Sequence, residues 1–114
     1  MSAPARGNKA KRSGQKEKTA LQEAIKWYSY AAKKGGPDVQ NTLADTYRKY
    51  RAILGISEKN INKMAFDLYK AAAEKDHAKA VLSLGLEYQK QGEFTEAGKY
   101  ISKALTLNLS LIHI

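Results

Sequence analysis

Three segments of this 114-residue chain repeat one pattern of small and bulky side chains. They are residues 24–32 (AIKWYSYAA), 65–73 (AFDLYKAAA) and 97–105 (AGKYISKAL). In each segment alanine stands first and eighth, and bulky residues stand fourth and fifth. Positions i, i+3, i+4 and i+7 lie on one face of an α-helix. A pattern that recurs along a chain indicates a helical repeat array, and this feature constrains the fold more than any other.

The same helical period runs through most of the chain and predicts five helices. Their expected starts are Thr19, Pro37, Ser57, Ala78 and Thr95. Serine and threonine are good N-caps, proline suits a first helical turn, and glycine before a start can end the previous helix. The connections are short, which favours antiparallel neighbours, and no segment alternates with a period of two. The sequence therefore predicts an all-α fold.

Residues 78–108 place small and bulky side chains at regular helical spacings, namely Leu84, Gly85, Tyr88, Gly92, Ala97, Ile101 and Ala104. In these spacings the segment resembles a tetratricopeptide repeat, a helix–turn–helix unit. In such a unit Gly85 and Ala97 let two helices approach closely. Tyr88 and Ile101 fill the space between them.

In the earlier half of the chain the aromatic residues of segment 26–28 are followed by a glycine turn and then by Leu43 and Tyr47. In this pattern it resembles the related Sel1-like repeat, which has a longer internal connection. The first alanines of the three segments are 41 and 32 residues apart, and the extra residues fall around 51–61. Both resemblances imply stacked antiparallel hairpins, an α-solenoid, over residues 19–108, and a scaffold or adaptor that binds other proteins. The alternative is a helical bundle without repeats that is rich in alanine and tyrosine.

Both ends of the chain fall outside the repeat pattern. Residues 1–18 are rich in Gly, Ser, Lys and Arg without apolar periodicity, so we expect a disordered basic tail. Residues 109–114 (LSLIHI) resemble a translated sequencing adapter, so we expect a non-native tail and a longer natural protein. The alternative is a genuine apolar helix end. An uncapped last helix would expose Tyr100, Ile101, Leu105 and Leu107, which predicts marginal stability or self-association.

Composition excludes several classes of function. The chain has no cysteine, so it has no disulfide, thiolate metal site or cysteine nucleophile. No apolar run approaches the length of a membrane span, and no secretory signal is visible. The two histidines, His77 and His113, have no third ligand at metal-binding spacing. We therefore expect a cytoplasmic protein that is not an enzyme and needs no cofactor or metal.

The repeat resemblance also implies a binding surface. In tetratricopeptide arrays the first helix of each unit lines a concave groove that holds extended or helical peptides. Here the first helices would be Pro37–Leu54 and Ala78–Gln91. On these helices the apolar stripe is expected to face the core. The residues outside that stripe include Asn41, Asp45, Arg48, Lys49, Lys79, Leu82, Leu86, Gln89 and Lys90. This surface is mildly basic with two leucines, so we expect a peptide or protein partner with acidic and apolar character.

Nucleic-acid binding is the alternative function. The net charge is +9, and residues 1–20 alone carry six Lys or Arg against one Glu. The basic patch Arg48–Arg51 (RKYR) could contact phosphates together with that tail. Tyr50 falls on the core stripe, however, and residues 21–114 contribute only fourteen basic against ten acidic residues. We therefore expect a protein partner first and nucleic acid second.

Overall fold

The structure, a computed structural model, describes the backbone of residues 2–112 and the surroundings of side chains 14–108. Its helices are α1 (Ser2–Lys33), α2 (Pro37–Lys49), α3 (Arg51–Leu54), α4 (Glu58–Ala73), α5 (Ala78–Lys90) and α6 (Phe94–Ile112). No strand occurs among residues 2–112, so the predicted all-α class is confirmed. The expected count of five becomes six because Tyr50, with φ −109°, interrupts the helix expected over Pro37–Leu54 and leaves the short α3.

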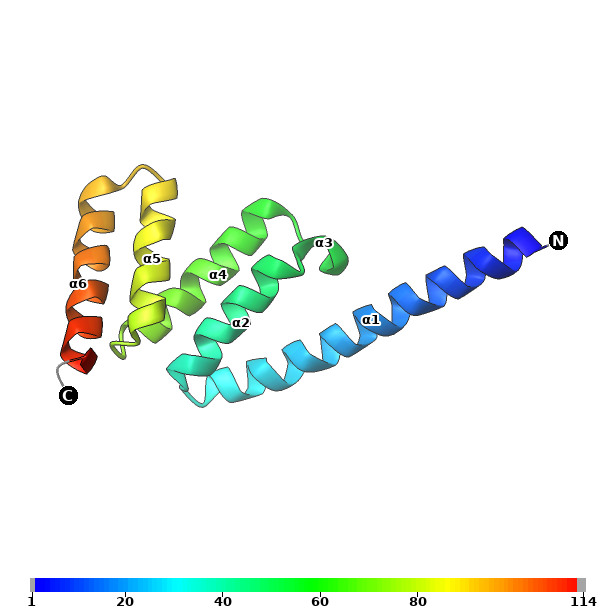
Figure 1. Cartoon of the computed structure of the whole chain (residues 1–114), viewed down its shortest axis with the longest axis horizontal. Helices are drawn as coiled ribbons and strands as arrows, with labels where there is room; N and C mark the ends of the chain where they lie inside the picture. The colour runs from blue at the N-terminus through cyan, green and yellow to red at the C-terminus, as the bar shows by residue number, and fades with distance from the viewer. Residues whose placement is uncertain (1, 113–114) are drawn as a thin grey trace.

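The helices pack mainly in sequence order along an elongated molecule of 64 × 30 × 24 Å. Helix α2 packs against α4, α4 against α5, and α5 against α6. The C-terminal part of α1 lies beside α2, and the rest of α1 projects away from the other helices (Figure 1). The N-terminus is therefore at one end of the molecule, and the pair formed by α5 and α6 is at the other.

Local chemistry accounts for several helix boundaries. Pro37 occupies the first turn of α2, and the Ser57 hydroxyl accepts a hydrogen bond from the Asn60 amide at 3.2 Å, as expected for an N-cap. Gly55 closes α3 with φ 69°, a left-handed conformation that glycine adopts without strain. Helix α6 starts at Phe94, so Thr95 lies in its first turn and is not its cap.

The two ends of the chain differ from the expected boundaries. Helix α1 starts at Ser2, so Thr19 lies inside it and is not its N-cap. Disorder of residues 1–18 in solution stays a prediction, which the two glycines and the many charges of that segment support. At the other end α6 continues to Ile112. Residues 113–114 of the expected non-native tail lie outside the described residues, and its origin also stays a prediction.

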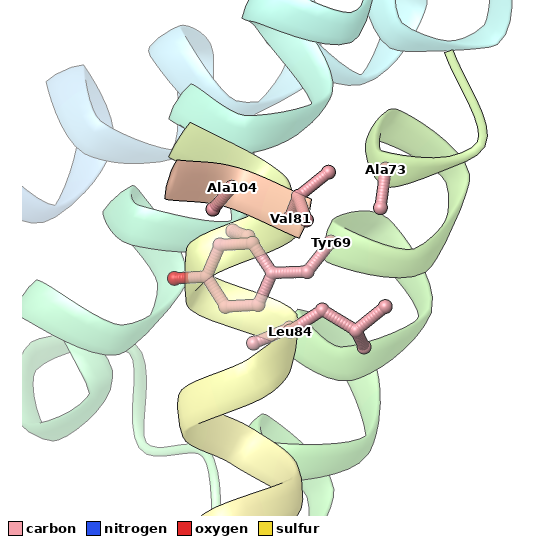
Figure 2. Packing of buried hydrophobic residues seen from close by; sticks show 7 residues of the cluster. Tyr69, Ala73, Val81, Leu84 and Ala104 are labelled. Atoms are coloured by element: carbon pink, nitrogen blue, oxygen red, sulfur yellow. The ribbon is translucent and has the colours of Figure 1, made fainter. Parts of the chain in front are cut away.

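The core lies where α4, α5 and α6 meet, and Ala44 of α2 also belongs to it. Tyr69 and Ala73 of α4 pack with Val81 and Leu84 of α5 and with Ala104 of α6 (Figure 2). The first and eighth alanines of the second and third repeated segments are buried, as the pattern predicts, at Ala65, Ala72, Ala97 and Ala104. In the first segment Ala24, Trp27 and Tyr28 are exposed. The alanines of the repeated pattern are therefore buried on α4 and α6. On α1 only the C-terminal end of the repeated segment is covered by other helices.

Helix α6 exposes less apolar surface than we expected. Tyr100 stacks on Tyr88 with ring centroids 5.4 Å apart and an interplanar angle of 12°. Tyr100, Ile101 and Leu107 are half-buried, and of the four side chains expected to be exposed Leu105 alone is. The expected exposure is therefore wrong for three residues, because α5 covers part of this face. Self-association through α6 stays a prediction.

Candidate functional site

A groove lies on the side of the molecule where the end of α2 meets α5. Its volume is about 270 Å³, and it is lined by Arg48, Tyr69, Ser83, Leu86, Glu87, Gln89 and Lys90. We call it the α2/α5 groove. Helix α2 contributes Arg48, α4 contributes Tyr69, and α5 contributes the rest. Four of the nine residues expected at a binding surface are thus brought together: Arg48, Leu86, Gln89 and Lys90.

A buried carboxylate joins the two helices inside the α2/α5 groove. Glu87 has a side chain only 7% exposed, and its Oε1 forms an ion pair with Arg48 Nη1 across the helix–helix contact. Lys90 Nζ lies 3.4 Å from the same oxygen. Two cations therefore share one carboxylate, and these three groups keep one net positive charge, with the Asp45 carboxylate nearby on the hydroxyl of Tyr69. The groove is suited to an anionic group, and exposed Leu86 adds apolar surface beside it.

A second polar contact connects α2 to α4. The buried Tyr69 hydroxyl donates a hydrogen bond to Asp45 Oδ1 at 2.5 Å. Burial raises the pKa of the Tyr69 phenol well above its usual range, and the hydrogen bond to Asp45 raises it further. Tyr69 therefore stays a neutral donor at physiological pH, and Asp45 is held on α2 as its acceptor.

The expected residues Asp45 and Lys49 also line a different hollow. This α1/α2 groove has a volume of about 680 Å³ and is bounded by α1, α2 and α3. Its lining residues are Glu17, Ala20, Leu21, Ala24, Tyr28, Thr42, Asp45, Thr46, Lys49, Tyr50 and Ile53. It is larger than the α2/α5 groove, it lies where α1 diverges from α2, and its lining mixes apolar with polar and charged side chains. It brings together only two of the residues expected for binding.

Three expected residues lie outside both grooves. Lys79 and Leu82 are exposed on α5 but line neither groove. Asn41 is buried in α2, so its expected exposure is wrong. Its Oδ1 has no hydrogen-bond partner within the described part of the chain. The sequence pattern placed Asn41 on the solvent side because a polar residue off the apolar stripe is normally exposed.

Sequence reasoning missed Glu87 and the hydroxyl of Tyr69. Glu87 stands three residues after Leu84 and seven after Ala80, so it lies on the buried face of α5. An acidic residue at that register is a signal for a buried ion pair, because a lone buried carboxylate is costly. Tyr69 belongs to the second repeated segment. The pattern of that segment predicts a buried ring but gives no information about a hydrogen bond from its hydroxyl group.

One residue of the basic patch Arg48–Arg51 is engaged in an ion pair. Arg48 pairs with Glu87, and Lys49 Nζ lies 5.3 Å from the centroid of the Tyr50 ring.

Among the described residues no group of three or more His, Asp or Glu side chains is placed to hold a metal ion. Within the same residues no helix is both long enough and apolar enough to cross a membrane.

Replacing Glu87 with glutamine is expected to destabilise the fold by about 1–2 kcal/mol. The change leaves the half-buried Arg48 guanidinium without the carboxylate that pairs with it, and a half-buried charge without its partner is unfavourable. The loss is smaller than for a fully buried pair because Arg48 is 27% exposed. Urea unfolding measures it. Glu96→Gln removes the exposed partner of Lys99 and should cost at most about 0.5 kcal/mol. Equal losses for both variants would contradict the burial of the Arg48–Glu87 pair.

The raised pKa of Tyr69 predicts a loss of stability at alkaline pH. The folded state holds the phenol proton more tightly than the unfolded state, whose tyrosines titrate near about pH 10. The contribution is fully present below that pH and is lost as pH rises towards the folded pKa, by up to about 1.4 kcal/mol per pH unit. Above about pH 10 the free energy of unfolding of Tyr69→Phe, measured in urea, should fall less steeply with pH than that of the unsubstituted chain. Parallel curves would contradict this prediction.

Comparison with known proteins leaves these features without a family assignment. No family model matches this sequence, and a search of curated proteins found no significant match.

Proposed function

We propose that this chain is a helical-repeat scaffold, tetratricopeptide-like or Sel1-like, that binds a peptide or protein partner in the α2/α5 groove. The observation that carries the proposal is the groove itself, where Lys90 and the Arg48–Glu87 ion pair lie beside an exposed leucine. An acidic side chain of the partner can approach Lys90 and Arg48, and an apolar side chain can cover Leu86. The chemistry is binding, and no catalytic step is proposed.

The packing order of the helices supports the repeat part of the proposal. Helices α2 and α4 form one hairpin, and α5 and α6 form the next. Contact between α4 and α5 then joins the second helix of one hairpin to the first helix of the following one. In a stacked array of this kind α2 and α5 are the first helices, and the groove between them is the concave surface. A cytoplasmic location is part of the same proposal.

Selection from a library of random linear peptides tests the function. The folded full chain is the bait, and we expect enriched peptides that combine acidic and apolar residues. Leu86→Ser and Lys90→Glu should each weaken binding of the enriched peptides, because they remove the apolar and cationic contacts. Leu105→Ser and Lys99→Glu make the same exchanges at exposed positions of α6 and should leave binding unchanged. Equal effects from both pairs, or no enrichment, would overturn the proposal.

A further inference from the structure

The outward face of α1 carries two large aromatic side chains in solvent. Trp27 is 62% exposed and Tyr30 is 59% exposed. They stand three residues apart, so they are neighbours on one side of the helix. Among the described side chains of α1, Leu21, Ile25, Ser29 and Ala31 are half-buried and Ala32 is buried, and all of these except Ala31 stand at the spacing of another side. The two rings therefore lie on a face of α1 that the other helices do not cover.

Positive charge is concentrated in the same part of the chain. Residues 1–34 contain nine Lys or Arg and two Glu, a net charge of +7, and residues 35–114 contain eleven and nine, a net charge of +2. Lys26 Nζ lies 5.7 Å from the centroid of the Trp27 ring, and Lys34 Nζ lies 4.8 Å from that of Tyr30. Each exposed ring therefore has an ammonium group beside it.

We propose that this face of α1 binds single-stranded nucleic acid. Trp27 and Tyr30 stack on unpaired bases, and Lys26 and Lys34 contact phosphates. Such binding sites combine a basic track with aromatic side chains on which successive bases stack. An exposed lysine–ring contact is weak, so each flexible lysine can move from its ring to a phosphate when a base takes its place.

Single-stranded nucleic acid fits this face better than other anionic partners do. A duplex hides its base faces, so the two rings would remain unused. A helix that lies on a membrane needs a broad apolar face, but Leu21 and Ile25 of α1 are turned towards the protein. An acidic peptide can pair with lysines but gains little from two flat rings. The proposal is independent of the α2/α5 groove, because no residue is shared between the two surfaces.

Trp27 is the single tryptophan of the chain, so its fluorescence reports directly on the proposed contact. The full chain is titrated with oligouridylate and with oligothymidylate of about 12 nucleotides, a length within known site sizes. We expect saturable quenching with at least one of the two oligonucleotides. The one that binds more tightly identifies the ligand as RNA or DNA. Absence of quenching with both strands at low salt would overturn the proposal.

Variants separate stacking from general charge attraction. With a labelled oligonucleotide and anisotropy as the readout, Trp27→Ala should weaken binding about 10-fold at constant salt, and Trp27→Phe should restore most of it. Lys26→Gln with Lys34→Gln should make the slope of log affinity against log salt shallower by about 1.4. Phe94→Ala and Lys99→Gln remove a ring and a charge that are similarly exposed on α6 and should change neither quantity.

Three competitors complete the test. The proposal expects a DNA duplex, polyglutamate and vesicles of phosphatidylserine with phosphatidylcholine to bind more weakly than the single strand at equal ionic strength. A duplex that binds as tightly, with Trp27→Ala without effect, would reduce the surface to a nonspecific basic helix. Tighter binding to vesicles or to polyglutamate would assign the face to a membrane or to an acidic protein and overturn the proposal.

Discussion

Leu84→Ala is expected to lower the free energy of unfolding by about 3 kcal/mol, within the range of roughly 2.7–5.0 kcal/mol seen for buried leucines. Leu84 is 1% exposed and, with Val81, is one of the two largest fully buried side chains among the described residues. It lies in the core between α4 and α5 (Figure 2). The substitution removes apolar burial and leaves a cavity that rigid helices cannot fully close.

Urea unfolding followed by far-ultraviolet circular dichroism measures this loss. A domain of this size has roughly 5–15 kcal/mol of stability, so the variant should lose a large fraction of it. Leu105→Ala makes the same truncation at a residue that is 61% exposed and should change stability by at most about 0.5 kcal/mol. Leu84→Met keeps the volume and should cost less than about 1.5 kcal/mol. Similar losses for Leu84→Ala and Leu105→Ala would contradict the described core.

The repeated alanines show what periodicity can predict. Ala65 and Ala97 are buried because each lies on the apolar stripe of a helix that has a packed neighbour on that side. Ala24 has the same place in its segment, yet it is exposed at the wall of the α1/α2 groove. A 3.6-residue period tells which face of a helix is apolar, but it does not tell whether another element covers that face. The helix class was therefore predictable, and the uneven burial of the three copies was not.

The break at Tyr50 had no sequence signal. The segment around it contains neither proline nor glycine until Gly55, and its apolar residues continue the helical period. The break is a matter of backbone geometry at one residue, with φ −109° and ψ 21°. Such a local departure depends on packing around the end of α2, and a single sequence does not record it.

The candidate site was predictable in part for a similar reason. Leu86, Gln89 and Lys90 were found because they lie off the apolar stripe of α5 and are exposed. Arg48 was found as a surface cation, but its pairing with Glu87 joins residues that are 39 positions apart. Charge pairs of this kind follow from how two helices cross, and the period of either helix alone does not contain that information.

Gly85→Ala is expected to destabilise the protein even though alanine is the better helix former. Gly85 is buried in the interior of α5. A Cβ atom there would lie 2.8 Å from Ile101 Cγ1, 3.2 Å from the Ile101 backbone nitrogen and 3.3 Å from the Ala97 carbonyl oxygen. Two of these atoms are backbone of α6, so relief requires the two helices to separate. We expect overpacking of about 1–3 kcal/mol to exceed the propensity gain of about 1 kcal/mol.

A matched glycine makes the sign of the effect decisive. Gly98 lies in α6 with nothing within 4 Å of an added Cβ atom, so Gly98→Ala should stabilise the protein by about 0.5–1 kcal/mol. Gly85→Val adds two more methyl groups to the crowded side and should cost about 3 kcal/mol. If Gly85→Ala stabilised the protein as much as Gly98→Ala does, the close approach of α5 and α6 would be refuted.

A double-mutant cycle connects the effect to its cause. Ile101→Ala removes the Cγ1 atom nearest to the added Cβ, so the Gly85→Ala, Ile101→Ala pair should lose less stability than the sum of the single losses. The expected coupling is about 1 kcal/mol, measured by urea unfolding of the four chains. Additive losses would mean that contact with the α6 backbone alone limits the size of the side chain that fits at position 85. In that case Gly85 would be required by the distance between the two helices and not by the side chain that fills it.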